Sequence, residues 1–268
     1  MISPPLVLCS GSLGSAPLEE KLTAAAAAGF SWVSLYGHEY LAAVQRGVDV
    51  PALLLSLGLR VAEVDGVAIT LSDRALVADA LEIAVATRAR SITIVETSAL
   101  DTSDEAQVDS AVDAFAAACD LAADHGVLVH IEPFAWSDLG SSAVVGRIVR
   151  AANRPNGGLL LDLWHHVRGP DQGVLDDAIP HSMLLGIQLA DTAPEAWQNV
   201  RDECMQHRLL PGDGSADLAA RLGDLAARGP LPPIGIEVFG TALDRLTPFE
   251  AATTARAALE ATVGAAGL

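Results

Sequence analysis

The chain carries little positive charge and almost no lysine. Its 268 residues include 34 Asp and Glu against 16 Lys and Arg, a formal net charge of −18 at pH 7. Such a chain repels phosphate backbones and anionic lipid surfaces, so we expect neither nucleic acid nor membrane as a partner. The only lysine, Lys21, lies in an Ala-rich segment that is typical of a surface helix. Because Schiff-base chemistry and P-loop phosphate binding both need a placed lysine, both are disfavoured.

Cysteine and long apolar runs are also scarce. Cys9, Cys119 and Cys204 are far apart and form no CxxC pair, which argues against a disulfide framework or a zinc ribbon and fits a reducing cytoplasm. No apolar run approaches the roughly 20 residues of a membrane-spanning helix, and the N-terminus has no basic segment followed by a long apolar one. The sequence therefore predicts a cytoplasmic globular protein whose ligands are small molecules.

Short apolar runs, in contrast, recur along the whole chain, each followed by a longer Ala- and Leu-rich stretch with helical spacing. The eight runs are Leu6–Ser10, Trp32–Tyr36, Arg60–Val64, Ser91–Glu96, Val127–Glu132, Gly158–Leu163, Leu184–Ala190 and Ile234–Phe239. They are continuous rather than alternating, as expected for strands buried on both faces. Eight βα units in this length predict one (β/α)8 barrel domain over residues 1–268, with a doubly wound open sheet as the alternative.

Helix starts and one long loop add detail to this prediction. The segments Thr102–Glu105 and Thr247–Glu250 both have the pattern of a capping box, and the second has proline at the first helical position. The longest irregular segment, Asp191–Gly214, follows the seventh strand. Loops at that end of a barrel build active sites, so its length is a functional hint.

Four successive strands finish with an oxygen-donor side chain: Glu132, Asp162, Gln188 and Glu237. Any one of them alone is typical of a helix cap or an ion pair. At the ends of consecutive strands, however, all four would converge on one mouth of the barrel, where three negative charges repel each other unless a cation is present. A set of three carboxylates and an amide oxygen favours Mn²⁺ or Mg²⁺ over a thiolate-type site, while Co²⁺ and Zn²⁺ stay open.

Four segments resemble the xylose-isomerase-like sugar phosphate isomerase/epimerase superfamily. They are His130–Trp136, Gly158–His165, Gly186–Asp191 and Gly235–Phe239, and the resemblance is specific over residues 127–240. It implies a TIM barrel that holds one divalent metal through Glu132, Asp162, Gln188 and Glu237.

Within this superfamily, two features are similar to the dehydratase branch. Gln188 stands where many members have histidine. Glutamine at this position is similar to what bacterial 3-dehydroshikimate dehydratases show. The segment Arg208–Gly214 resembles the R-x-x-P-G-[DE]-G loop of that branch and of inosose dehydratases, with an arginine that could hold a substrate carboxylate or phosphate. The resemblance also implies that His165 contacts substrate or transfers a proton, and its pKa range suits that role.

Five further residues are predicted to lie near the pocket. His38, Glu63 and Glu96 come at the ends of earlier strands, Trp136 could form an apolar wall over a substrate ring, and Arg168 could be a second anion clamp. Each of them has an ordinary structural interpretation as well, such as a helix cap, a loop anchor or a solvated side chain.

Three functions follow as hypotheses. The first is a metal-dependent isomerase or epimerase of a sugar, sugar phosphate or cyclitol, in which Glu132 and Glu237 move a proton through a metal-stabilised enediolate and the substrate is a small polyhydroxy carbonyl compound. The second is a lyase of the dehydratase type that uses His165 and Arg208. The third is a non-catalytic sugar-binding barrel. An endonuclease is opposed by Gln188 and the net charge. The oligomeric state stays open, and because barrels of this kind often pair through loops, a homodimer is one expectation.

Overall fold

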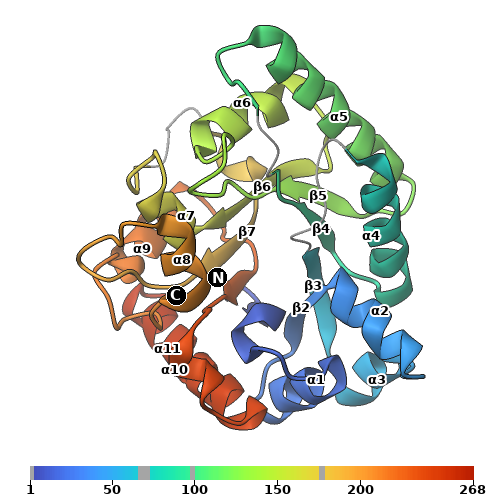
Figure 1. Cartoon of the computed structure of the whole chain (residues 1–268), viewed down its shortest axis with the longest axis vertical. Coiled ribbons are helices and arrows are strands. Elements are labelled where there is room, and N and C mark those ends of the chain that lie inside the picture. The colour runs from blue at the N-terminus through green and yellow to red at the C-terminus, as the bar shows by residue number, and fades with distance from the viewer. Residues whose placement is uncertain (1–2, 66–72, 97–99, 175–178) are drawn as a thin grey trace.

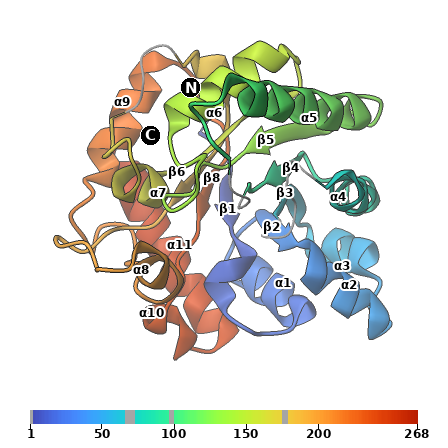
Figure 2. The same ribbon diagram turned by 45° about the horizontal axis from the view of Figure 1, so that its top comes forward.

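Eight parallel strands close into a barrel in the computed structural model, which describes residues 3–65, 73–96, 100–174 and 179–268. Each strand pairs with the next along the chain, and β8 returns to β1 (Figures 1 and 2). The strands are β1 Leu6–Leu8, β2 Trp32–Tyr36, β3 Arg60–Asp65, β4 Ser91–Ile94, β5 Leu128–Ile131, β6 Gly157–Asp162, β7 Leu184–Leu189 and β8 Ile234–Ile236. The predicted (β/α)8 barrel is therefore confirmed, and the open sheet is wrong.

Every strand lies within one of the predicted apolar runs or overlaps it almost completely. The agreement has a physical cause, because helices cover the outer face of a parallel barrel and side chains fill its interior, so both faces of each strand are apolar over most of its length. Leu35, Ile92, Val129 and Ile187 are buried examples from four different strands.

Helices surround the strands as an outer ring (Figure 1). The α-helices are α1 Leu18–Ala27, α2 Gly37–Gln45, α3 Val50–Leu57, α4 Arg74–Thr87, α5 Glu105–Ala123, α6 Ser142–Ala152, α7 Leu163–Arg168, α8 Val200–Gln206, α9 Leu218–Arg228, α10 Thr241–Asp244 and α11 Pro248–Ala265, and two 3-10 turns, η1 Ser10–Leu13 and η2 His181–Met183, complete the set. The predicted irregular segment after β7 thus contains a short helix, α8.

One predicted capping box is present and the other is wrong. At α11, the Thr247 hydroxyl accepts from the backbone of Glu250, and the Glu250 side chain accepts from the backbone of Thr247. At α5 the helix begins at Glu105, and the Asp104 carboxylate accepts from the N–H of Ala106. Because an Asx side chain directly before the helix satisfies the free N–H, Asp104 replaces the predicted threonine as the cap.

The predicted surface position of Lys21 is wrong. Its side chain is 3 % exposed, and its Nζ lies 2.6 Å from Oε1 of Glu39 and 3.0 Å from the carbonyl oxygen of Ser10. The Ser10 hydroxyl donates to the other oxygen of Glu39. Lys21 therefore joins α1 to the start of α2 through an ion pair with the partly buried Glu39.

The cysteine side chains are packed in the protein interior. Cys9, Cys119 and Cys204 are all buried and free. Among the described residues, none of the helices combines enough length with enough apolar character to cross a bilayer.

Candidate active site

A cavity of about 850 Å³ opens beyond the carboxyl ends of the strands. Its lining consists of Gly11, Gly14, Ser15, Tyr36, His38, Glu39, Asp65, Glu132, Phe134, Trp136, Ser137, Arg201, Cys204, Met205, Arg208, Glu237 and Phe239. The volume lies in the usual range for small-molecule sites, which is roughly 300–1,000 Å³. Because these residues follow strands from both halves of the barrel, the cavity occupies the end at which barrel enzymes place their chemistry.

Three buried side chains meet just below the cavity floor, and of these Glu132 is a lining residue of the cavity. One ligand atom each from Glu132, Asp162 and His165 lies within 4.8 Å of the others. His165 Nε2 is 3.9 Å from Oε1 of Glu132 and 3.9 Å from Oδ2 of Asp162. The strand-end residue Asp162 caps α7 by accepting from the N–H of Trp164, and the first turn of that helix brings His165 back over the strand end.

Arg208 places a guanidinium group among these side chains. Its Nη1 lies 2.6 Å from Oδ2 of Asp162 and 3.5 Å from Oε2 of Glu237, and it also donates to the backbone carbonyl of Glu237. The side chain is 2 % exposed and sits over the rings of Trp164 and Phe239. The arginine therefore compensates part of the negative charge at the cavity floor.

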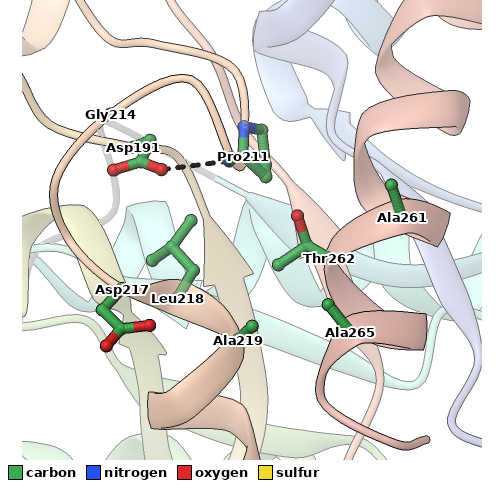
Figure 3. Close-up of a pocket in the computed structure, with 10 residues that line it drawn as sticks. Asp191, Pro211, Gly214, Asp217, Leu218, Ala219, Ala261, Thr262 and Ala265 are labelled. Carbon is green, nitrogen blue, oxygen red and sulfur yellow. Dashed lines mark hydrogen bonds between the residues drawn. The ribbon is translucent and has the colours of Figure 1, made fainter.

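The backbone around Arg208 is fixed from two sides. Asp191, just after β7, exchanges two backbone hydrogen bonds with Leu209, and the N–H of Arg208 donates to the carbonyl of Phe239 after β8. The Asp191 carboxylate also accepts from the N–H groups of Gly212 and Ala216. Figure 3 shows Asp191 facing the loop that contains Pro211 and Gly214. A Cβ atom at Gly214 would collide with Asp191, so glycine is required there.

The carboxyl groups at the cavity floor bind protons more readily than ordinary carboxyl groups. Burial, together with the neighbouring charges of Glu237, Asp65 and Asp162, raises the pKa of Glu132 well above its usual range. Burial and the charge of Asp65 do the same to the pKa of Glu237. A carboxylate with a raised pKa is a stronger base, so these two groups are suited to proton transfer near neutral pH.

His165 is held as a neutral ring. Burial, and then the charge of Arg208, lower its pKa well below the usual value. Its Nδ1 accepts from the N–H of Ala135 at 3.2 Å, and its Nε2 lies 3.1 Å from Nη2 of Arg208. The N–H of Ala135 makes Nδ1 an acceptor and so opposes a second proton on the ring. The ring also stacks on Phe134 and meets the edge of Trp136.

The donor set fits a divalent cation. Buried oxygen atoms without a hydrogen-bond partner among the described residues include Oε1 of Glu132 and Oε1 of Gln188. Carboxylate charge around the cavity floor also exceeds the single charge of Arg208. Gln188 lies directly beside Asp162 in the register of β6 and β7, although it is fully buried and does not line the cavity. Oxygen atoms of this kind are ligands for hard cations.

Of the next four predicted lining residues, two line the cavity and two do not. His38 lines the cavity and stacks on Tyr36, and Trp136 lines it beside Phe134. Glu63 and Glu96 are buried and are not among the lining residues.

Arg168, predicted as an anion clamp, does not reach the cavity. Its guanidinium donates to the buried carboxylate of Glu203 at 2.6 and 2.8 Å and to the carbonyl of Ala193. Arg168 is the last residue of α7, and its long side chain extends to Glu203 and anchors α8. His166 likewise turns away from the cavity and contacts Asp171.

Sequence reasoning missed several lining residues, above all Asp65. It is the last residue of β3 and lies two positions beyond Glu63, so both side chains point into the barrel, Asp65 at the mouth and Glu63 below it. The alternation of side chains along a strand could have found it. Tyr36, whose hydroxyl lies 3.3 Å from Oε1 of Glu237, and Cys204, whose Sγ lies 3.0 Å from Nη2 of Arg208, had no comparable sequence signal.

Comparison with known families shows to which protein family the chain belongs. The model of the xylose isomerase-like TIM barrel family matches residues 22–262. The chain belongs to this family. A 3-dehydroshikimate dehydratase from Pseudomonas aeruginosa is 32 % identical over 121 residues, which is 44 % of this chain and 19 % of that relative. The matched segment thus spans about a fifth of the length of the dehydratase.

Solved structures of this family share the fold. The IolI protein, with a bound zinc atom, superposes with a TM-score of 0.85 at 18 % identity and covers 97 % of this chain and 98 % of its own. D-allulose 3-epimerase from Methylomonas sp., in complex with D-allulose, superposes with a TM-score of 0.70 at 15 % identity and covers 97 % of both chains. At such identities the likeness concerns the fold alone.

Proposed function

We propose that this chain is a divalent-metal-dependent enzyme that removes a proton from the carbon next to the carbonyl group of a small polyhydroxylated substrate. The outcome would be isomerisation or epimerisation of a sugar, a sugar phosphate or a cyclitol. One observation carries the proposal: Glu132, Asp162, His165 and Glu237 surround a single guanidinium group at the floor of an 850 Å³ cavity. Family membership and the presence of epimerases and dehydratases among its relatives support it.

In this proposal Glu132, Asp162, Gln188 and Glu237 hold the metal, with His165 close enough to join them. Oxygen ligands of this hardness favour Mn²⁺ or Mg²⁺, and such an ion, when bound, would supply Lewis-acid polarisation of a substrate carbonyl group and so make the neighbouring C–H more acidic. Arg208 keeps Asp162 and Glu237 in place through its contacts at 2.6 and 3.5 Å. Phe134 and Trp136 supply the apolar wall on which a sugar carbon skeleton can lie.

Proton transfer falls to the carboxyl groups with raised pKa values. Glu132 and Glu237 come from β5 and β8 and both line the cavity. One can take the proton from the substrate carbon while the other returns a proton to the opposite face or to the adjacent carbon. Because burial and neighbouring charges raise both pKa values, each group holds a proton more readily than an ordinary carboxylate and can serve as acid as well as base.

The test is metal analysis followed by isotope exchange. Metal-loaded protein is incubated in D₂O with a panel of ketoses and inososes, and deuterium is expected at the carbon next to the carbonyl of the substrate. E132Q and E237Q should lower the exchange rate at least about 100-fold, whereas E195Q, at an exposed position, should not. Metal-loaded protein that exchanges none of the panel would contradict the proposal.

A second candidate, a dehydratase, is favoured by two observations. One is the 121-residue match to 3-dehydroshikimate dehydratase, and the other is the Ala135–His165 hydrogen bond. A neutral ring that accepts at Nδ1 carries its hydrogen on Nε2, which faces the cavity floor. A carboxylate would take the proton from the substrate carbon. The β-hydroxyl would then leave as water with the proton from Nε2, and a C=C bond would form between the two carbons.

Product formation separates the two candidates. With 3-dehydroshikimate, a dehydratase gives an ultraviolet-absorbing catechol, whereas an epimerase gives none. H165A should lower dehydration at least about 100-fold while isotope exchange through the carboxylates largely survives. If neither 3-dehydroshikimate nor any inosose loses water, the dehydratase is excluded.

A further inference from the structure

Below the cavity floor, inside the barrel, a second group of polar side chains is completely enclosed. Glu63 on β3, Gln188 on β7, His130 on β5 and Ser91 on β4 are at most 5 % exposed. A buried carboxylate at this depth costs stability unless it has a task, because the interior of a barrel is otherwise apolar. The proposed proton transfer does not use any of the four.

The contact between Gln188 and Glu63 has a fixed direction. Nε2 of Gln188 donates to Oε1 of Glu63 at 3.1 Å. The end of a glutamine side chain can turn by half a rotation and exchange its NH₂ group for its oxygen. Because Oε1 of Glu63 accepts this hydrogen bond, the NH₂ group is the end of the Gln188 amide that faces Glu63. The oxygen Oε1 of Gln188 is left buried and without a hydrogen-bond partner among the described residues.

Glu63 is itself held from the other side of the barrel. The Ser91 hydroxyl donates to the carbonyl of Ala62, so its oxygen can accept from His130, whose Nε2 lies 2.9 Å away. The same Nε2 lies 3.6 Å from Oε2 of Glu63. His130 therefore donates to Ser91 and stands beside the Glu63 carboxylate, whose other oxygen accepts from Gln188.

We propose that Glu63 is a positioning residue that orients the amide of Gln188 so that its oxygen serves the metal site. This inference rests on the proposed function, in which Gln188 is one of the ligands. Gln188 stands beside Asp162 in the strand register, and its free oxygen belongs to a side chain whose nitrogen is already occupied. Groups that orient metal ligands from behind typically contribute 10- to 100-fold to metal affinity.

The experiment is a titration of the metal-free protein with Mn²⁺, followed by calorimetry and by the electron paramagnetic resonance spectrum of the bound ion. E63L removes the acceptor and should weaken Mn²⁺ binding about 10- to 100-fold, as should Q188A. E63Q keeps an oxygen that can accept from Gln188, so it should restore affinity to within about threefold of the wild type. The double variant E63L/Q188A should bind no more weakly than Q188A alone.

A merely structural role of Glu63 predicts a different pattern. In that case E63L and E63Q would change thermal stability while the affinity and the spectrum of bound Mn²⁺ stay as in the wild type. If E63L fails to fold, the exchanged pair E63Q/Q188E tests the inference instead, because it keeps one N–H···O bond and one free oxygen. This variant should bind Mn²⁺ with an affinity within tenfold of the wild type. Complete loss of binding would contradict the inference.

The failure of this inference is distinguishable from that of the proposed function. Wild-type protein that binds no Mn²⁺ would contradict the proposed function and the inference together. Wild-type binding that is weakened by Q188A but not by E63L would contradict only the positioning role. Equal weakening by E63L and E63Q would also contradict it, because the loss would then follow the charge of residue 63 rather than its hydrogen bond.

Discussion

Two buried cations, one in each half of the chain, have different amounts of negative charge around them. Lys21 faces one carboxylate, Glu39, at 2.6 Å, so the pair is balanced one to one. Arg208 contacts Asp162 and Glu237 and lies near Glu132, and the charge of Asp65 also reaches these groups. The first arrangement joins α1 to α2, whereas the second keeps an excess of negative charge that only a further cation or protons can neutralise. Charge imbalance, more than burial, thus marks the functional cluster.

The largest expected effect comes from removing Arg208. Among the described residues, Arg208 is the only arginine or lysine that contacts Asp162 and Glu237. R208M removes this cation, so the free energy of unfolding of the metal-free protein should fall by about 5 kcal/mol at pH 8. Saturating Mn²⁺ should recover part of this loss, because the ion supplies positive charge to the same cluster. Urea unfolding with and without metal measures both. R46M, which removes an exposed pair with Glu19, is the control and should leave the midpoint almost unchanged.

Removing Lys21 should break the balanced pair. K21M leaves Glu39 buried against Ser10 without its cation, and we expect a loss of about 3 kcal/mol in urea unfolding. Because the pair is one to one, K21M/E39Q should recover most of the loss. R208M/E237Q should recover little, since Asp162 and Glu132 keep their charges. Equal recovery in both double variants would mean that the two clusters do not differ in charge balance.

Proton uptake should reveal the excess charge at Glu132. A carboxyl group with a raised pKa in the folded state contributes stability that is fully present below its unfolded pKa, about 4.3, and is lost as the pH rises through the folded pKa. E132Q removes this titration, so the metal-free variant should be more stable than the wild type at pH 8, with a much smaller difference at pH 5. Urea unfolding at the two pH values measures the difference. A gain that is independent of pH would contradict the raised pKa.

The barrel could be predicted from the sequence because its signal is local. Continuous apolar runs such as Trp32–Tyr36 exist wherever a strand is buried on both faces, and all eight were found. Helix starts were less certain where several residues could act as the cap, as at Thr102 and Asp104. The burial of Lys21 could not be predicted, because its partner Glu39 is 18 positions away on another helix.

For the candidate site, sequence reasoning was better at naming residues than at placing them. The strand-end donors Glu132 and Asp162 do meet, since parallel strands bring their carboxyl ends to one edge. The direction of loop and helix side chains carries no such rule. Arg168 is three residues beyond His165 yet binds Glu203, and Arg208 reaches the carboxylates only because backbone pairs with Leu209 and Phe239 fix its loop.

The smallest expected effect concerns His166, which follows His165 directly but contacts Asp171 instead of the carboxylates around Arg208. Although partial burial acts in the opposite direction, hydrogen bonds from His166, Ser141 and Ser142 lower the pKa of Asp171 to about 2. A lowered pKa contributes stability above the unfolded pKa of about 3.9 that is lost as the pH falls through the folded value. H166A removes one of several donors to the Asp171 carboxylate, whose side chain is 9 % exposed, so it should cost about 1 kcal/mol above pH 4.

The same variant should leave the isotope-exchange rate within about threefold of the wild type, because the His166 ring faces Asp171 rather than the cavity. A group that takes part in proton transfer would change the rate by about 100-fold or more. H165A is the matched comparison, since the two histidines differ only in the side of α7 from which they project. If H166A lost as much dehydration or exchange activity as H165A, a second histidine would take part in the reaction. The contact of His166 with Asp171 and that of His165 with Arg208 would then not differ in function.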